Sequence, residues 1–167
     1  MSQKDLSQTK GKIIFVLNGP SGRRVHRTHN IVTNAGDLYH AQKVAGESPT
    51  NAFANLVLAS AGAAPGKTSN YDNITPIAST NKAPASGYPK TNDDDIDNTD
   101  AGVDVVTYKY YYTKADFNAA VISDGVITIA SPIAGSALLT HFEFASAFEK
   151  TADDTLTVFV NHEMLGV

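Results

Sequence analysis

The chain has 167 residues, of which 42% are hydrophobic and 18% are charged, and its formal net charge is −4. These values predict one globular domain with a buried core and argue against a disordered chain. The absence of cysteine excludes disulfides, thiolate nucleophiles, cysteine-ligated zinc and iron–sulfur clusters. No apolar run approaches the ~18 residues of a membrane-spanning helix, so no membrane partner is expected.

The charge is distributed unevenly along the sequence. Residues 1–50 contain seven Lys and Arg against three Asp and Glu, whereas residues 51–167 contain six against fourteen. Arg23, Arg24 and Arg27 form the main basic cluster. Nucleic-acid affinity needs many phosphate contacts from one basic face, so no nucleic-acid partner is expected. We predict instead that the three arginines belong to an interface with another copy or with a charged protein surface.

The first part of the chain predicts an arm and a β-hairpin. Residues 1–11 are polar, and we expect them to form a flexible arm in front of a single domain that spans residues 12–167. KIIFVL, residues 12–17, is a short β-branched apolar run and predicts a strand. The turn residues of NGPSG, residues 18–22, predict a connection to a returning strand over residues 25–33.

One short helix is expected next, within residues 35–48. Four apolar residues recur at the spacing of one helix face, which predicts an amphipathic helix. They are Leu38, Ala41, Val44 and Ala45. Gly46 is a suitable position for the helix to end.

A strand at residues 53–60 is followed by a long segment without periodicity. Residues 61–102 contain four of the seven prolines, and no helical or strand period persists there. Because connections are usually about 4–6 residues long, a loop of this length is either disordered or used for contacts. We predict that the loop is mobile in the isolated protein and becomes ordered when a neighbour packs on it.

The remainder of the chain is β-rich. Four stretches alternate between the two faces of a half-buried antiparallel sheet. They are residues 103–113, 117–130, 137–145 and 154–164. Asp124-Gly125 in the second stretch predicts a turn between two short strands. The fold class expected from the whole chain is mainly β: an antiparallel β-sandwich or jelly-roll-like single domain with one short helix and a long irregular loop.

A tyrosine stripe marks the first of these stretches. Its members are Tyr108, Tyr110, Tyr111 and Tyr112, and they occupy both faces of the strand. Tyrosine is favoured at protein interfaces because it buries area and keeps a polar tip. The four tyrosines are therefore interface candidates, and a core strand with one exposed tyrosine is an equally good interpretation.

An aspartate run within the long loop is a weak match to a calcium site. Asp93, Asp95 and Asp97 are two residues apart, as in loops that offer alternating oxygen ligands. The EF-hand template requires Gly at its sixth position and Glu at its twelfth, where this chain has Asn98 and Asp104. We therefore expect no metal or other cofactor, and we interpret the run as a solvated acidic turn or as a salt-bridge partner for a neighbour's arginines.

Residues 61–68, AGAAPGKT, match a loose phosphate-loop pattern. A nucleotide site would place Lys67 on the phosphates and Thr68 on magnesium, and it would require a helix after the loop, which the following residues do not predict. A Ser/His/Asp triad stays open, although no nucleophile-elbow pattern supports it. His141 and His162 lie in predicted strands, where we expect them to be packed or hydrogen-bonded. No catalytic residue is assigned, and no enzymatic activity is expected.

The second half of the chain contains a strand leading into a Gly/Ala/Pro/Thr loop, a middle strand of alternating aromatics, and a closing pair of strands. The closing pair carries Leu138, Leu139, His141 and Phe144, followed by Lys150, Asp154, Leu156 and Val158. Over roughly residues 53–164 this pattern resembles the small β-sandwich structural proteins of tailed bacteriophages. In those proteins the pair reads Leu-Leu-x-Arg-x-x-Phe and then Lys-x-x-x-Asp-x-Leu-x-Val, so His141 stands where they often have Arg.

The resemblance implies a virion protein, most simply a capsid decoration (cement) protein that binds the outer shell and stabilises contacts between major capsid subunits. A phage tail or fibre receptor-binding module is the alternative. The implied partners are the major capsid protein and further copies of this chain, as a homo-oligomer such as a trimer. The implied location is the capsid surface of the virion, after synthesis in the host cytoplasm.

Overall fold

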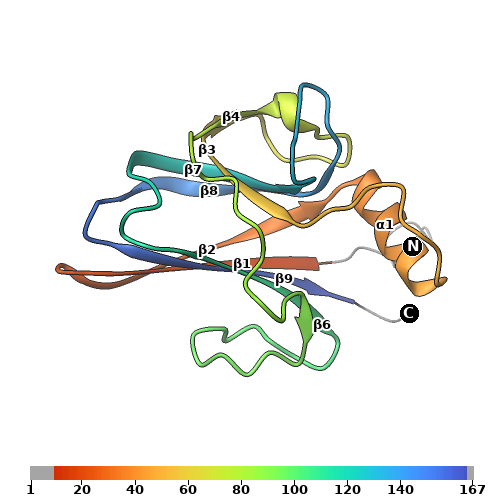
Figure 1. The fold of residues 1–167 in the computed structure, drawn as a ribbon, viewed down its shortest axis with the longest axis horizontal. Helices are drawn as coiled ribbons and strands as arrows, with labels where there is room; N and C mark the ends of the chain where they lie inside the picture. The colour runs from red at the N-terminus through yellow and green to blue at the C-terminus, as the bar shows by residue number, and fades with distance from the viewer. Residues whose placement is uncertain (1–9, 165–167) are drawn as a thin grey trace.

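The computed structural model describes residues 10–164, and within them nine strands form one antiparallel sheet (Figure 1). The strands are β1 (Lys10–Gly19), β2 (Gly22–Val32), β3 (Asn55–Gly62), β4 (Ile74–Pro76), β5 (Lys90–Thr91), β6 (Val105–Tyr112), β7 (Ala119–Thr128), β8 (Leu138–Lys150) and β9 (Thr155–Glu163). Their order across the sheet is β4-β3-β7-β8-β2-β1-β9-β6-β5. The expected mainly β, antiparallel single domain is confirmed.

The N-terminal arm expected at residues 1–11 lies largely outside the described residues, which begin at Lys10. Lys10 and Gly11 are already the first residues of β1 and pair with Ile31 and Asn30 of β2. The sheet therefore starts two residues before the predicted domain boundary. The predicted hairpin is present, with β1 and β2 in register along their whole length.

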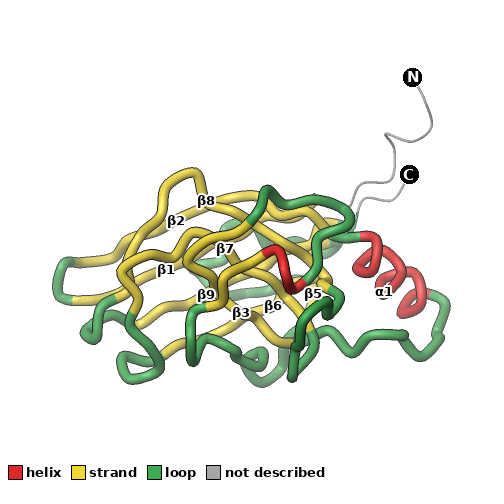
Figure 2. The backbone as a smooth tube through the Cα atoms, turned by 90° about the horizontal axis from the view of Figure 1, so that it is seen from above, coloured by secondary structure: helices red, strands yellow, loops and turns green. Residues whose placement is uncertain are grey.

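The sheet bends into two layers that face each other across the core (Figure 1). One layer contains β3, β7 and β8, and the other contains β2, β1, β9 and β6. The layers are joined through β8 and β2, which share only three residue pairs, from Asn30↔Phe142 to Val32↔Thr140. Beyond these pairs the two strands separate, so side chains can fill the space between the layers. The result is a sandwich-like body, with the helix α1 (Asn34–Val44) at one end (Figure 2).

The core lies between the two layers and is rich in aromatic side chains. Phe15 of β1 makes edge-to-face contacts with Phe142, Phe144 and Phe148 of β8, with ring centroids 4.9–5.8 Å apart. Such pairs stabilise a core beyond the area that they bury. The same cluster contains Ile13, Leu17, Leu56, Leu58, Tyr108, Tyr110, Tyr112, Ile122, Ile127, Leu139, Leu156, Val158 and Val160. The inward-facing residues of the alternating strands therefore meet in one core between the layers.

The prediction of a turn at Asp124-Gly125 is wrong, because both residues lie inside the continuous strand β7. Gly125 faces the neighbouring strand so closely that a Cβ atom there would lie 2.3 Å from the Phe142 ring. The glycine is therefore required for close packing within the sheet and not for a reversal of the chain. Asp124 points to the opposite face, where its carboxylate accepts a hydrogen bond of 2.5 Å from Ser123 Oγ.

The predicted helix is present as α1, with both ends defined by local chemistry. The Thr33 hydroxyl oxygen accepts a hydrogen bond of 3.1 Å from the Gly36 N–H and caps the N-terminus. Gly46 has a φ of +73° and follows the helix, as predicted. The Glu47 N–H donates to the Gln42 carbonyl at 2.8 Å, which completes the usual glycine-terminated helix end.

The buried face of α1 differs from the prediction. Gly36 and His40 face the body, and a Cβ atom on Gly36 would lie 2.2 Å from the Leu139 carbonyl oxygen. Because the helix lies so close to β8, the face that carries glycine is the one that packs against the body. The four apolar residues of the predicted face are exposed, with Leu38 at 48% and Val44 at 82%. The amphipathic interpretation of α1 is therefore wrong.

The long segment 61–102 is held on the body by contacts with its own chain. It contains the short strands β4 and β5 and the three-residue 3-10 helix η2 (Tyr71–Asn73). Thr80 is fully buried, and its Oγ1 accepts a hydrogen bond from the Leu58 N–H and donates one to the Ile77 carbonyl. The chain itself supplies the packing that the sequence led us to expect from a neighbour, so the predicted mobility of the isolated loop is not supported.

Candidate interaction surface

Two of the three candidate arginines lie on the outer face of β2 and form ion pairs within the chain. Arg23 Nη2 lies 2.8 Å from Asp97 Oδ1, and Arg27 Nη1 lies 3.3 Å from Asp100 Oδ2. Both aspartates belong to the connection between β5 and β6, residues 92–104, which we call the strap. The basic and acidic clusters of the sequence therefore neutralise each other within one chain. This pairing removes the main reason for assigning Arg23 and Arg27 to an interface with a neighbour.

Arg24 has a different environment. Its Nη2 lies 2.7 Å from Asp154 Oδ2, and the Asp154 side chain is almost fully buried. Burial by itself raises the pKa of Asp154, but hydrogen bonds from the Thr151 amide and hydroxyl and the charge of Arg24 outweigh it, so the pKa lies below its usual value. Arg24 is thus the partner of a buried carboxylate.

We expect Arg24→Ala to lower the free energy of unfolding by about 1–3 kcal/mol, because Asp154 then stays buried without its cation. Arg23→Ala is the matched control, since its ion pair is exposed and is worth about 0–1 kcal/mol. Denaturant unfolding at pH 7 measures both variants. The pKa of Asp154 is lowered by folding, so the pair stabilises above pH 3.8 and its contribution disappears as the pH falls through the folded-state pKa. Equal losses in the two variants would contradict this assignment.

The aspartate run does not converge on one point. Asp93 is buried and accepts a hydrogen bond of 2.9 Å from the Asn98 side-chain amide. Asp95 lies 2.6 Å from Lys109 Nζ, and Asp97 pairs with Arg23. Across residues 10–164, no three His, Asp or Glu side chains are arranged to hold a metal ion. The carboxylates thus act as salt-bridge and hydrogen-bond partners, within the same chain rather than toward a neighbour.

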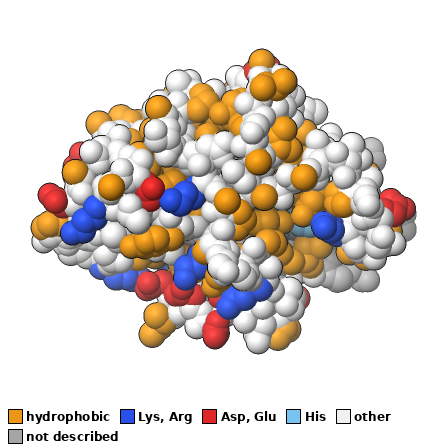
Figure 3. Space-filling view, viewed as in Figure 1, with side chains coloured by type: hydrophobic (Ala, Val, Ile, Leu, Met, Phe, Trp, Pro, Cys, Tyr) orange, Lys and Arg blue, Asp and Glu red, His pale blue; other side chains and the backbone are white. Residues whose placement is uncertain are grey.

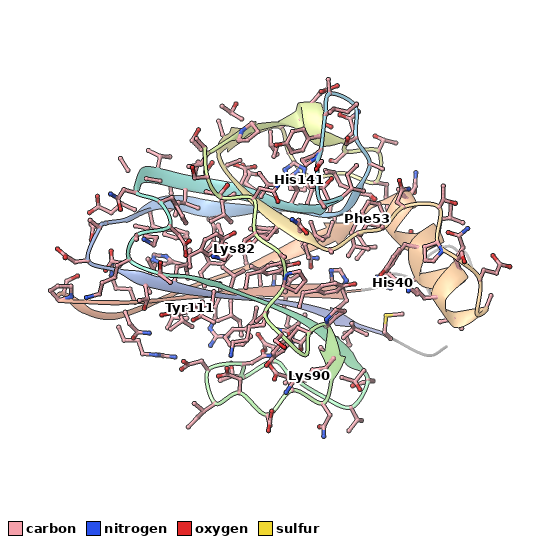
Figure 4. All side chains as sticks on the ribbon, in the orientation of Figure 1. His40, Phe53, Lys82, Lys90, Tyr111 and His141 are labelled. Carbon is pink, nitrogen blue, oxygen red and sulfur yellow. The ribbon has the colours of Figure 1, made fainter. Side chains whose placement is uncertain are left out.

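Three of the four candidate tyrosines lie in the core. The side chains of Tyr108, Tyr110 and Tyr112 are at most 2% exposed. The Tyr110 hydroxyl donates to the Ala54 carbonyl at 2.6 Å, and burial raises the pKa of Tyr110 well above its usual value. Tyr111 points outward and is 45% exposed (Figure 4). The stripe is therefore a core strand with one exposed tyrosine, and only Tyr111 stays an interface candidate.

An apolar groove lies between α1 and β6, and no local sequence pattern indicated it. Its volume is about 440 Å³. It is lined by Tyr39, His40, Lys43, Val44, Pro89, Val106, Tyr108 and Met164. Hydrophobic side chains gather over this part of the surface, beside basic and histidine side chains (Figure 3). Val44, one of the exposed apolar residues of α1, thus lines a hollow in the body.

Two buried histidines lie at and beneath the base of the groove. The ring centroids of His40 and His162 are 5.5 Å apart, and His162 Nε2 lies 2.8 Å from the Asn30 side-chain nitrogen. Burial lowers the pKa of both histidines, that of His162 to about 3. Both rings are therefore neutral at pH 7, and the base of the groove is uncharged. The predicted packing of His162 in its strand is confirmed.

The phosphate-loop match leads into no α-helix. Lys67 Nζ lies 2.7 Å from Asp37 Oδ2 of α1, and the residues after Thr68 continue into the short helix η2. The next residue, Ser69, instead contacts His141 of β8. Ser69 and His141 are 72 residues apart, and no local sequence pattern indicates a contact at that separation, so the sequence analysis did not predict it.

Residues 10–164 contain no helix that is long and apolar enough to cross a membrane. No protein-family model matches the sequence, and comparisons with curated proteins and with solved structures find no significant match. The fold and the surfaces described above are therefore the basis for a functional proposal.

Proposed function

We propose that this protein is a structural component of a bacteriophage virion, namely a capsid decoration protein that binds the outer shell and stabilises contacts between major capsid subunits. The motif resemblance over residues 53–164 supports the virion context. The partners in this proposal are the major capsid protein and further copies of the chain. The alternative is a tail or fibre module, which shares the architecture but has another location on the particle.

The observation that carries the proposal is the apolar groove beside α1, which the exposed Val44 lines. Leu38 and Val44 face solvent, while the same helix uses Gly36 and His40 to contact its own body. A contiguous apolar patch on a small domain usually marks a protein contact. A decoration protein needs such a surface because its function is to bind other chains.

We expect Val44→Asp to weaken binding to decoration-free shells by about tenfold or more, because a carboxylate would have to lose water in an apolar contact. Ile133→Asp is the matched control. Ile133 is 74% exposed but lies in the loop between β7 and β8, outside the groove. Co-sedimentation with shells over a range of protein concentrations gives the affinities, and melting temperatures verify that both variants fold.

Equal binding by the two variants would remove the groove from the proposal. The location of the protein tests the rest of it. Stoichiometric copies on purified tail-free capsids are expected for a decoration protein, whereas recovery with tails alone would replace it by the tail or fibre alternative.

A further inference from the structure

Three residues with the chemistry of a hydrolytic triad meet on the β7–β8 layer, at the position labelled for His141 in Figure 4. Ser69 Oγ lies 3.1 Å from His141 Nδ1, and His141 Nε2 lies 3.5 Å from Asp124 Oδ1. Ser69 comes from the loop after β3, His141 from β8 and Asp124 from β7. Such triads are recognised by geometry and roles, not by sequence order, and their hydrogen bonds are often long before substrate binds.

The pair behind Ser69 is buried, and the Ser123 hydroxyl occupies Asp124 Oδ2 while Oδ1 faces His141. The side chains of His141 and Asp124 are 0% and 3% exposed. Within residues 10–164, His141 Nε2 and Asp124 Oδ1 make no hydrogen bond, and at 3.5 Å each is the polar atom available to the other. Gly62 makes room for the carboxylate, since a Cβ atom there would lie 2.4 Å from Asp124 Oδ1. With Nε2–H directed at Asp124, the Nδ1 lone pair faces Ser69.

Ser69 is held in the orientation that proton transfer to His141 requires. Its Oγ accepts a hydrogen bond of 2.9 Å from the Gly66 N–H, which leaves the hydroxyl hydrogen for His141 Nδ1. Burial lowers the pKa of His141, whereas the carboxylates of Asp124 and Glu143 act in the opposite direction. The ring is therefore neutral at pH 7 and can accept a proton.

Ser69 also lines a pocket of about 250 Å³ at the N-terminus of α1. Asn34 and Ala35, the first residues of the helix, line the same pocket. The first amide groups of a helix lack intrahelical acceptors and carry partial positive charge. The Asn34 N–H already donates to the Lys67 carbonyl at 2.8 Å, so the Ala35 N–H is the helix donor for a carbonyl oxygen that becomes negative during attack.

We propose that Ser69 is an acylatable nucleophile that attacks short-chain carboxylic esters, with His141 as the general base and Asp124 as its positioning residue. The small pocket restricts the acyl group to a short one. This site is separate from the groove and goes beyond the virion role, and it replaces the expectation that the chain has no enzymatic activity.

The reaction has two balanced stages. Ser69 Oγ bonds to the ester carbon while its proton moves to His141 Nδ1, and the carbonyl oxygen becomes an oxyanion beside the Ala35 amide. The bond to the alcohol oxygen then breaks, and His141 returns the proton to that oxygen, which leaves acyl-Ser69. Water attacks the acyl group in the second stage, His141 takes its proton, and Ser69 Oγ receives that proton as the carboxylic acid departs.

The full chain should hydrolyse p-nitrophenyl acetate, and a fluorophosphonate probe should form an adduct that peptide mass spectrometry assigns to Ser69. Ser69→Ala should abolish the adduct and reduce the hydrolysis rate by about 100-fold. Ser136→Ala is the matched control, because Ser136 accepts a hydrogen bond from the Ile133 N–H and has no histidine partner. Its rate should equal that of the unmodified chain.

Asp124→Asn separates positioning from a purely structural role. Because Asp124 acts to raise the pKa of His141, its loss should move the midpoint of the pH–rate profile for adduct formation to lower pH, in addition to slowing the reaction. Absence of a Ser69 adduct at pH 8 in the unmodified, folded chain would overturn the proposal. Ser69→Ala should bind shells as well as the unmodified protein does, so this proposal and the decoration role fail independently.

Discussion

Tyr110→Ala should lower the free energy of unfolding by about 3–5 kcal/mol, the range found when a buried aromatic residue is truncated. Tyr110 is fully buried in the centre of β6. Its removal leaves a cavity between the two layers and deprives the Ala54 carbonyl of its 2.6 Å hydrogen bond. Since a domain of this kind has about 5–15 kcal/mol of stability, one substitution would remove a large part of it. Denaturant unfolding followed by circular dichroism measures the change.

The neighbouring residue provides the control. Tyr111→Ala removes the same side chain from the same strand, but from the solvent-exposed face, and should change the free energy of unfolding by less than about 1 kcal/mol. Tyr110→Phe keeps the ring and isolates the hydroxyl, with an expected loss of about 1 kcal/mol. Similar losses for Tyr110→Ala and Tyr111→Ala would contradict the difference in burial between the two faces of β6.

The two tyrosines also show how far the sequence can be interpreted. Alternation places Tyr108, Tyr110 and Tyr112 on one face and Tyr111 on the other, and the structure keeps this division. Alternation does not say whether the richer face meets another copy or another layer of the same sheet. That choice depends on the three residue pairs between β8 and β2 that bring the layers together, and these pairs join residues about 110 positions apart. The strands were therefore predictable, whereas the burial of the stripe was not.

Local signals failed where packing with distant residues decided the outcome. Asp124-Gly125 has the composition of a turn, but the Phe142 ring needs the space above Gly125, and a strand results. The apolar spacing on α1 indicated a packed face, but Gly36 allowed a closer contact with β8 and turned Leu38 and Val44 to solvent. The contact between Asp124 and His141 follows the same rule, because the register of β7 on β8 brings the two residues together.

The ion pairs of the strap illustrate the same limit for function. The clusters around Arg23 and Asp97 were visible in the sequence, and their opposite charges indicated a contact. Their intramolecular pairing required β2 and the strap to lie side by side, which no local pattern encodes. Once the charges are paired, the groove beside α1, rather than the charged clusters, is the surface that we propose for docking.

Deletion of residues 154–167 should prevent folding. β9 lies between β1 and β6 and pairs with β1 from Asn18↔Thr155 to Lys10↔Glu163, and with β6 along its whole length. Leu156, Val158 and Val160 are fully buried, and each is worth roughly 1.5–3 kcal/mol. Their sum approaches the whole stability of a domain of about 5–15 kcal/mol.

The deletion would also split the sheet, because β1 and β6 have no other strand between them and each would expose an unpaired edge. We expect the 1–153 chain to be insoluble or to lack a cooperative melting transition, as measured by the soluble fraction and by thermal circular dichroism. Truncation after Met164 is the control, since it leaves β1, β6 and β9 complete and should keep a cooperative transition. A soluble 1–153 chain with a sharp transition would show that β1 and β6 can pair directly, and that β9 is an appendage to a smaller core.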